Sequence, residues 1–263
     1  KDYYEYLVRY STGSSDSIKD LQKQVEQKRK EDLLQLSELL TKNPILAKES
    51  ESYQLDTSDP SQILAQLKET IKKDFPEAPD ANFTVKYVDE ALEDYLSPAF
   101  YLTSPIDDYK ENSIYINEGS HYEKMKLFTT LAHEGFPGHM YQYAYMYENV
   151  GSNYIKALSN ISAYTEGYAV YAQYEALSYL DGVDQTLLEA YKENELATYC
   201  MIILADIGIH YDGWSVEEFK EFMESKGFSL DDASIQTQYA QLQANPAAFE
   251  PYYVGYHEII NMK

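Results

Sequence analysis

The stretch LAHEGFPGHMYQ (residues 131–142) holds two of the five histidines of the chain and shapes both the fold and the chemistry that we expect. In the usual zinc-peptidase signature, H-E-x-x-H, two histidines one helical turn apart bind the metal, and the glutamate after the first acts as general base. Glu134 would take that role here. His133 and His139, however, are six residues apart. On a regular helix this spacing turns the second imidazole about 240° away from the first, so a continuous helix cannot form the site.

The residues between the two histidines supply a break in the helix. Pro137 lacks a backbone N–H, and its ring would clash with the carbonyl of His133, four residues back. Gly135 and Gly138 can adopt unusual backbone dihedrals. We therefore expect a kinked active-site helix in which His139 returns to the same metal.

A catalytic zinc site normally has three protein ligands and an open position for water. Glu166 is the best candidate for the third ligand, because it lies in the apolar, small-residue stretch SAYTEGYAVYAQYEAL (162–177). The small residues would let this helix pack closely against the one that bears the histidines, and a carboxylate buried there without a partner would be costly. Glu148 and Glu175 are rivals that we expect to face solvent. The donor set suits Zn²⁺ best and also accepts cobalt or manganese.

A second pair, in LADIGIH, places a carboxylate and an imidazole on one helical face at i, i+4 spacing. We expect Asp206 to orient His210, and His210 to hydrogen-bond the oxyanion of the reaction. Tyr252, Tyr253 and Tyr256 compete for the oxyanion role. The alternative is a structural, buried hydrogen-bonded pair. The two remaining histidines, 121 and 257, are expected to be structural or exposed.

Working outward, apolar spacing predicts a mainly α fold with a small β-sheet, an α+β class. The edge strand of such a sheet can pair with an extended peptide substrate. We divide the chain into a helical scaffold, residues 1–80, which continues an upstream region, and a metallopeptidase catalytic region, residues 81–263. The expected helices are 15–48, 60–74, 121–134, 138–149, 153–180, 184–211, 215–225 and a short one at the end, and the expected strands are 83–88, 100–102 and 113–116.

Composition narrows the range of partners. The chain has 44 acidic and 21 basic residues, a formal charge of −23, which disfavours nucleic acid and anionic membrane surfaces. No apolar run reaches the roughly 18 residues of a membrane span. The single cysteine, Cys200, excludes a disulfide within the chain and a thiolate metal cluster. We expect a peptide substrate and leave the oligomeric state open.

Two other functional readings remain open. In one, the chain is a non-catalytic, surface-exposed protein that binds a peptide or other ligand and retains a degenerate metal site. In the other, His133 and His139 are core histidines of a helical scaffold without metal.

Three blocks of the sequence carry a resemblance to a known family. HEGFPGHMYQ, AYTEGYAVYAQ and ADIGIHYDGW resemble the bacterial "domain of unknown function 885" family over roughly residues 80–260. That family is grouped with the gluzincin zinc peptidases of the thermolysin clan. The resemblance implies a gluzincin-like fold, with His133, His139 and Glu166 as metal ligands, Glu134 as base and His210 in the site.

The resemblance also has departures and further implications. Tyr168 stands where the family usually has Trp, Gln173 where it often has Glu, and NPAAFEPYYVGYHEI (245–259) where it usually has P-G-Q-A-x-x-Y. Family members are about twice as long, which together with the missing initiator Met implies a piece of a longer protein. The resemblance also implies an extracellular or cell-surface lipoprotein of a Gram-positive bacterium, with a cytoplasmic location as the alternative.

Overall fold

The computed structural model describes residues 1–46, 48–49, 53, 55–105, 107–120, 124–150 and 161–263. It is mainly helical with one small sheet, as the sequence predicts. The α-helices are α1 (Asp2–Thr12), α2 (Ile18–Lys42), α4 (Pro60–Thr70), α5 (Lys124–Glu134), α6 (His139–Val150), α8 (Ser162–Ala176), α9 (Gln185–Ile207), α10 (Val216–Ser225), α11 (Asp232–Ala244) and α12 (Glu250–Met262). The strands are β1 (Asn82–Tyr87), β2 (Ala99–Leu102) and β3 (Glu111–Ile116). Short 3-10 turns lie at Ile71–Lys73, Glu90–Leu92 and Leu177–Tyr179, and a π-helix at Gly208–Asp212.

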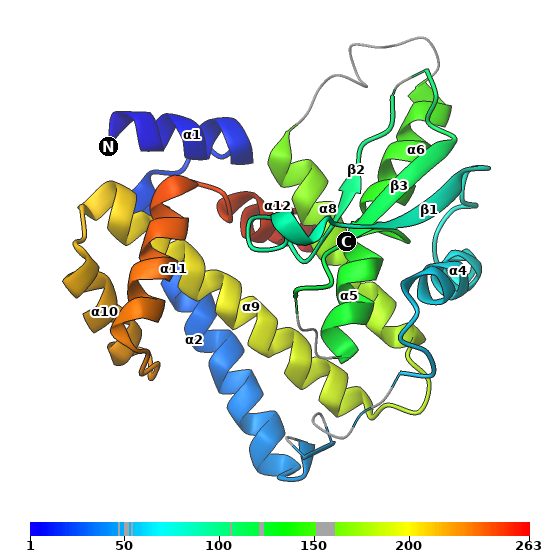
Figure 1. Cartoon of the computed structure of the whole chain (residues 1–263). Helices are drawn as coiled ribbons and strands as arrows, with labels where there is room; N and C mark the ends of the chain where they lie inside the picture. The colour runs from blue at the N-terminus through cyan, green and yellow to red at the C-terminus, as the bar shows by residue number, and fades with distance from the viewer. Residues whose placement is uncertain (47, 50–52, 54, 106, 121–123, 151–160) are drawn as a thin grey trace.

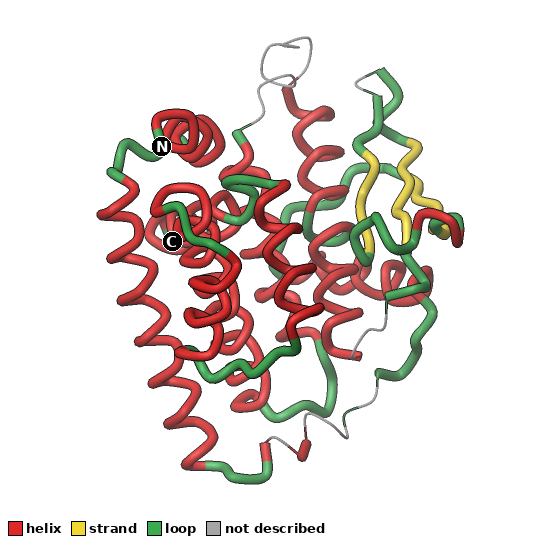
Figure 2. Tube along the Cα trace, turned by 60° about the vertical axis from the view of Figure 1, so that its left-hand side comes forward, coloured by secondary structure: helices red, strands yellow, loops and turns green. Residues whose placement is uncertain are grey.

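The sheet has the order β1-β3-β2, so β2 is an edge strand. β1 pairs with β3 in parallel, and β2 pairs with β3 antiparallel, with Ala99 opposite Ile116. Along β3, every second side chain is buried, including Ile114 and Ile116, which is the period-2 pattern of a strand with one face on a core. α5 contacts β2, and α4 contacts β1. The sheet and the N-terminal helix lie on opposite sides of the molecule (Figure 1, Figure 2).

Two long helices form the body of the helical part. α2 and α9 run side by side, and α8 packs closely on α12 (Figure 1). The largest hydrophobic cluster combines Leu64 and Ile71 with Ile114 and Leu131, and a second cluster combines Val25 with residues of α9. Residues from both sides of position 80 therefore share the same cores.

Several boundaries differ from the prediction. The sequence patterns do not predict α1 and α11. α9 ends at Ile207, and the chain continues as a π-helix through Asp212 instead of a regular helix to residue 211. α8 occupies only the later part of the predicted helix 153–180, part of which lies outside the described residues. Among the described residues, no helix combines the length and apolar character that a membrane crossing requires.

Candidate metal centre

The segment between the two histidines breaks the helix, as predicted. α5 ends at Glu134, and α6 begins at His139. Neither Gly135 nor Gly138 has a positive φ, so the break does not use the left-handed conformation that glycine allows. Gly138 is needed for space: a Cβ there would lie 1.8 Å from the carbonyl oxygen of His133.

The break brings the two imidazoles onto Glu166. Nε2 of His133 lies 3.5 Å from Oε2 of Glu166, and Nε2 of His139 lies 3.3 Å from the same oxygen. The two rings are nearly perpendicular, with centroids 4.7 Å apart. Both histidines are buried. The three residues predicted as metal ligands thus converge, from α5, α6 and α8.

A glycine crossing sets the position of Glu166. On the next residue, Gly167, a Cβ would lie 2.2 Å from the carbonyl carbon of Gly255 in α12, and a Cβ on Gly255 would lie 1.8 Å from the carbonyl oxygen of Ala163. The small-residue face of α8 therefore makes its closest approach to α12. The sequence pattern predicts that this face packs against the helix that bears the histidines. α8 contacts that helix as well.

Glu134 lies beside the predicted ligands. One ligand-type atom of each of His133, Glu134 and His139 lies within 4.8 Å of the others. The backbone N–H of Tyr101, in the edge strand β2, donates a 2.8 Å hydrogen bond to Oε2 of Glu134. The edge strand thus fixes the orientation of this carboxylate.

The side chain of Gln173 orients His133. Oε1 of Gln173 lies 2.8 Å from Nδ1 of His133. Because a carboxamide oxygen only accepts, this contact favours a proton on Nδ1, and the neutral imidazole would then have the lone pair of Nε2 free for a metal ion. Nε2 is the nitrogen that faces Glu166.

Burial and neighbouring charges have opposite effects on the pKa values of Glu166 and His133. Burial alone would raise the pKa of Glu166, but the imidazoles of His133 and His139 hold that pKa well below its usual value. Burial would lower the pKa of His133, whereas Glu166 and Glu134 raise it above the usual value. The carboxylate of Glu166 is therefore charged and depends on its neighbours for compensation.

These residues open onto a cavity of about 670 Å³. β2 lines one side with Ala99, Phe100 and Tyr101, and α12 contributes Tyr252. The ring of Tyr252 stacks on His133, with centroids 6.0 Å apart and an 11° interplanar angle. Burial raises the pKa of Tyr252 above its usual value, and the charge of Glu166 raises it further, so the hydroxyl keeps its proton.

Asp206 and His210 are not among the residues that line this cavity. They lie 3.5 Å apart, between Oδ1 and Nε2, but Nε2 of His210 also lies 3.0 Å from the carbonyl oxygen of Leu242. The His210 ring stacks on Tyr4, whose hydroxyl donates to Oδ2 of Asp206 at 2.7 Å. This arrangement matches the structural alternative for the pair.

The other candidates from the sequence lie elsewhere. Glu148 is exposed, and Glu175 pairs with Lys263. Tyr253 and Tyr256 are buried but do not line the cavity, and burial lowers the pKa of His257 to about 4. His121 lies outside the described residues.

Three residues of the centre have roles that the sequence reading missed: Gln173, Tyr101 and Tyr199, which stacks on Tyr252. Gln173 follows Glu166 by seven residues, two helical turns, and so lies on the same face of α8. That spacing could have identified it. Tyr101 acts through its backbone N–H, for which the residue type carries no signal.

Comparisons with known proteins support the fold. A family model described as "Bacterial protein of unknown function (DUF885)" matches residues 2–263. A comparison with curated proteins finds no match. Similar solved structures include a candidate lipoprotein from Colwellia psychrerythraea, with 17% sequence identity and a TM-score of 0.80, and a candidate lipoprotein of unknown function from Shewanella oneidensis, with 18% and 0.74. Each match covers 99% of this chain, but it covers only 48% of the Colwellia chain and 52% of the Shewanella chain. This chain therefore spans about half the length of either. At this identity the likeness shows a shared fold alone.

Proposed function

The chain belongs to the DUF885 family, and we propose that it is a zinc-dependent peptidase of the gluzincin kind, in which Glu134 is the general base. The convergence of three donor atoms carries this proposal. Nε2 of His133 and Nε2 of His139 lie 3.5 and 3.3 Å from Oε2 of Glu166. Ligands at about 2.0–2.1 Å around a tetrahedral zinc stand about 3.3 Å from one another, so these separations fit a zinc ion.

The chemistry of the donor set also fits. Two histidines and one glutamate are a known catalytic zinc set that leaves a fourth position open. Oε2 of Glu166 is buried and, among the described groups, has no hydrogen-bond partner. A buried carboxylate oxygen without a donor is costly, and a cation bound between these side chains would compensate it.

Glu134 is placed to move the proton. A zinc ion bound by His133, His139 and Glu166 would act as a Lewis acid that polarises the scissile carbonyl and lowers the pKa of water. Glu134 takes a proton from the attacking water and passes it to the leaving amine. Because Tyr101 holds Oε2 of Glu134, the other carboxylate oxygen is the one that exchanges the proton.

The edge strand β2 suits an extended peptide. The carbonyl oxygen of Pro98 accepts a 2.8 Å hydrogen bond from the backbone N–H of Asn117, just beyond β3, whereas the N–H of Tyr101 is turned to Glu134. Backbone groups alternate sides along a strand, so those of Ala99 face the cavity with those of Tyr101. A peptide laid along β2 could pair with Ala99 and bring a carbonyl to the metal centre.

Tyr252 replaces His210 in the oxyanion role. It lines the cavity, stacks on His133 and keeps its proton at neutral pH. Its O–H can donate to the oxygen on which negative charge develops, which is the largest single contribution in many hydrolases.

Metal content tests the proposal first. Mass spectrometry of the chain purified without chelators should find about one zinc per chain, and His133→Ala should abolish it. The zinc-loaded chain should then hydrolyse members of a peptide mixture, while Glu134→Gln keeps zinc and loses turnover by about 10²- to 10⁴-fold. A chain without metal after zinc is added back would refute the proposal. Zinc binding without turnover would favour the non-catalytic binding protein.

A further inference from the structure

One face of α5 leads away from the metal centre. Lys126, Thr129, Thr130 and His133 all line the cavity, at i, i+3, i+4 and i+7 spacing. Seven residues are two helical turns, so Lys126 lies on the same face as His133, about 10 Å further along the helix axis. On this face, Thr129 and Thr130 lie between them, and the short threonine side chains leave the cavity open above the helix.

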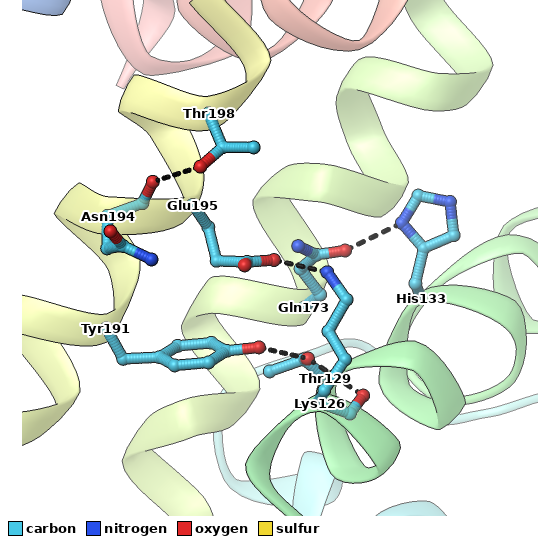
Figure 3. Close-up of polar contacts among 8 residues, drawn as sticks. All are labelled: Lys126, Thr129, His133, Gln173, Tyr191, Asn194, Glu195 and Thr198. Carbon is cyan, nitrogen blue, oxygen red and sulfur yellow. Dashed lines mark hydrogen bonds and ion pairs between the residues drawn. The ribbon is translucent and has the colours of Figure 1, made fainter. Parts of the chain in front are cut away.

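α9 bounds the cavity behind this face. The Lys126 ammonium pairs with the carboxylate of Glu195, and the Thr129 hydroxyl lies 3.1 Å from the hydroxyl of Tyr191 (Figure 3). Glu195 and Tyr191 are one turn apart on α9, and neither lines the cavity. These two contacts join α5 to α9 at the Lys126 end of this face.

The Lys126 end of the cavity carries one positive charge. Among the described residues that line the cavity, Lys126 is the only lysine or arginine. Its side chain is 45% exposed, while that of Glu195 is 17% exposed. An ammonium has three N–H donors, and only one is needed for the contact with Oε2 of Glu195, so the others are available to a ligand in the cavity that Lys126 lines. In a chain of charge −23, this ammonium is the group of the cavity lining that would attract an anion.

We propose, on the basis of the peptidase function proposed above, that Lys126 binds the free C-terminal carboxylate of the substrate and that the chain is a carboxypeptidase. An extended residue spans about 3.3–3.6 Å. The separation of about 10 Å between His133 and Lys126 along α5 equals about three such lengths, and a hydrogen bond of about 2.8 Å to the ammonium takes up most of one, so at most two residues fit beyond the scissile bond. Glu195 is a positioning residue that holds the ammonium at this end of the cavity.

The test compares peptides that differ only at the C-terminus. Glu134→Gln, zinc-loaded, serves as a binding form without turnover, and calorimetry measures the dissociation constants of one peptide as free acid and as C-terminal amide. A charge-assisted hydrogen bond predicts about 10- to 100-fold tighter binding of the acid. Adding Lys126→Met should remove that difference, Lys126→Arg should retain most of it, and Lys220→Met should leave it unchanged. Lys220 is the matched control because it also joins two helices, through Asp232.

The outcomes separate this inference from the proposed function. Equal binding of acid and amide, or acid preference that survives Lys126→Met, would overturn the role of Lys126. The wild-type chain should release one or two C-terminal residues and should show a raised KM with Lys126→Met. Internal cleavage of amidated peptides would overturn the carboxypeptidase assignment while leaving the peptidase intact. Acid-selective binding without any hydrolysis would overturn the peptidase and keep the carboxylate site.

Discussion

Oε1 of Gln173 lies 2.8 Å from Nδ1 of His133, and this contact leaves Nε2 of His133 to face Glu166 and the proposed metal site. Gln173→Leu removes the acceptor at similar volume, so the imidazole can rotate and change tautomer. We expect the dissociation constant for zinc to rise about 10- to 100-fold, measured by competition with a fluorescent chelator. Gln173→Glu keeps an acceptor and should bind zinc at least as tightly as the wild type. Unchanged affinity in Gln173→Leu would show that the contact does not orient the ligand.

Tyr252→Phe tests the oxyanion donor. The substitution keeps the ring that stacks on His133 and removes the hydroxyl, so we expect kcat to fall about 10²-fold with zinc content unchanged. Tyr253→Phe is the matched control, because Tyr253 is the next residue of α12 and packs in a different core. Steady-state kinetics on the zinc-loaded variants measures the effect. Equal losses in both variants would assign the effect to α12 packing and count against an oxyanion role.

Gly138→Ala tests the close approach at the break between α5 and α6. The added Cβ would lie 1.8 Å from the carbonyl oxygen of His133, a backbone atom that cannot move without displacing the ligand. We expect the free energy of unfolding in urea to fall by about 3 kcal/mol or more, together with zinc affinity. Gly13→Ala, at a left-handed position with open space around it, should cost only about 1–2 kcal/mol and leave zinc binding intact. A Gly138→Ala variant that binds zinc normally would contradict this account of the break.

The buried pair of Asp206 and Glu250 predicts a pH dependence. Both carboxyl groups are fully buried, and the hydroxyl of Tyr4 lies 2.7 and 2.6 Å from their oxygens. Burial, reinforced by the charge of Asp206, raises the pKa of Glu250 well above its usual value. The protonated carboxyl is therefore the form that suits the fold. Its contribution is complete below the unfolded pKa of about 4.3 and is lost as pH rises toward the folded pKa.

Urea unfolding between pH 4.5 and 8.5 measures this dependence. Glu250→Gln cannot ionise, and its amide can hydrogen-bond Tyr4 as the protonated carboxyl does, so its stability relative to wild type should increase with pH, by at most about 1.4 kcal/mol per unit. Glu258→Gln, at an exposed position of the same helix, should follow the wild-type curve. Parallel curves for Glu250→Gln and wild type would contradict a buried, protonated Glu250.

Local sequence patterns predicted much of this fold. The three strands, the helix after Pro60 and the break before His139 follow from alternation, proline placement and the clash that Pro137 would cause in a continuous helix. The convergence of His133, His139 and Glu166 was also anticipated, because a catalytic zinc needs a third donor and Glu166 sits in an apolar stretch.

Long-range contacts set the limit of such predictions. The hydroxyl of Tyr4 meets Asp206 and Glu250 across 202 and 246 positions of the sequence, and no local period encodes that contact. Without Tyr4 and Glu250 in view, the spacing of Asp206 and His210 suggested a catalytic pair. The structure shows that Asp206 accepts hydrogen bonds from Tyr4 of α1 and from the backbone N–H of Ala247, between α11 and α12, and lies outside the cavity lining.

For protein engineering, the contact between Gly167 and Gly255 limits which residues near the cavity can be substituted. The two backbones touch, so no side chain can be introduced at this crossing without separating Glu166 from Tyr252. Variants sought for altered selectivity should therefore leave α8 and α12 unchanged at this point. Diversity is better placed on the lining residues of β2 and α5, such as Phe100 and Thr130, which border the cavity from outside the crossing.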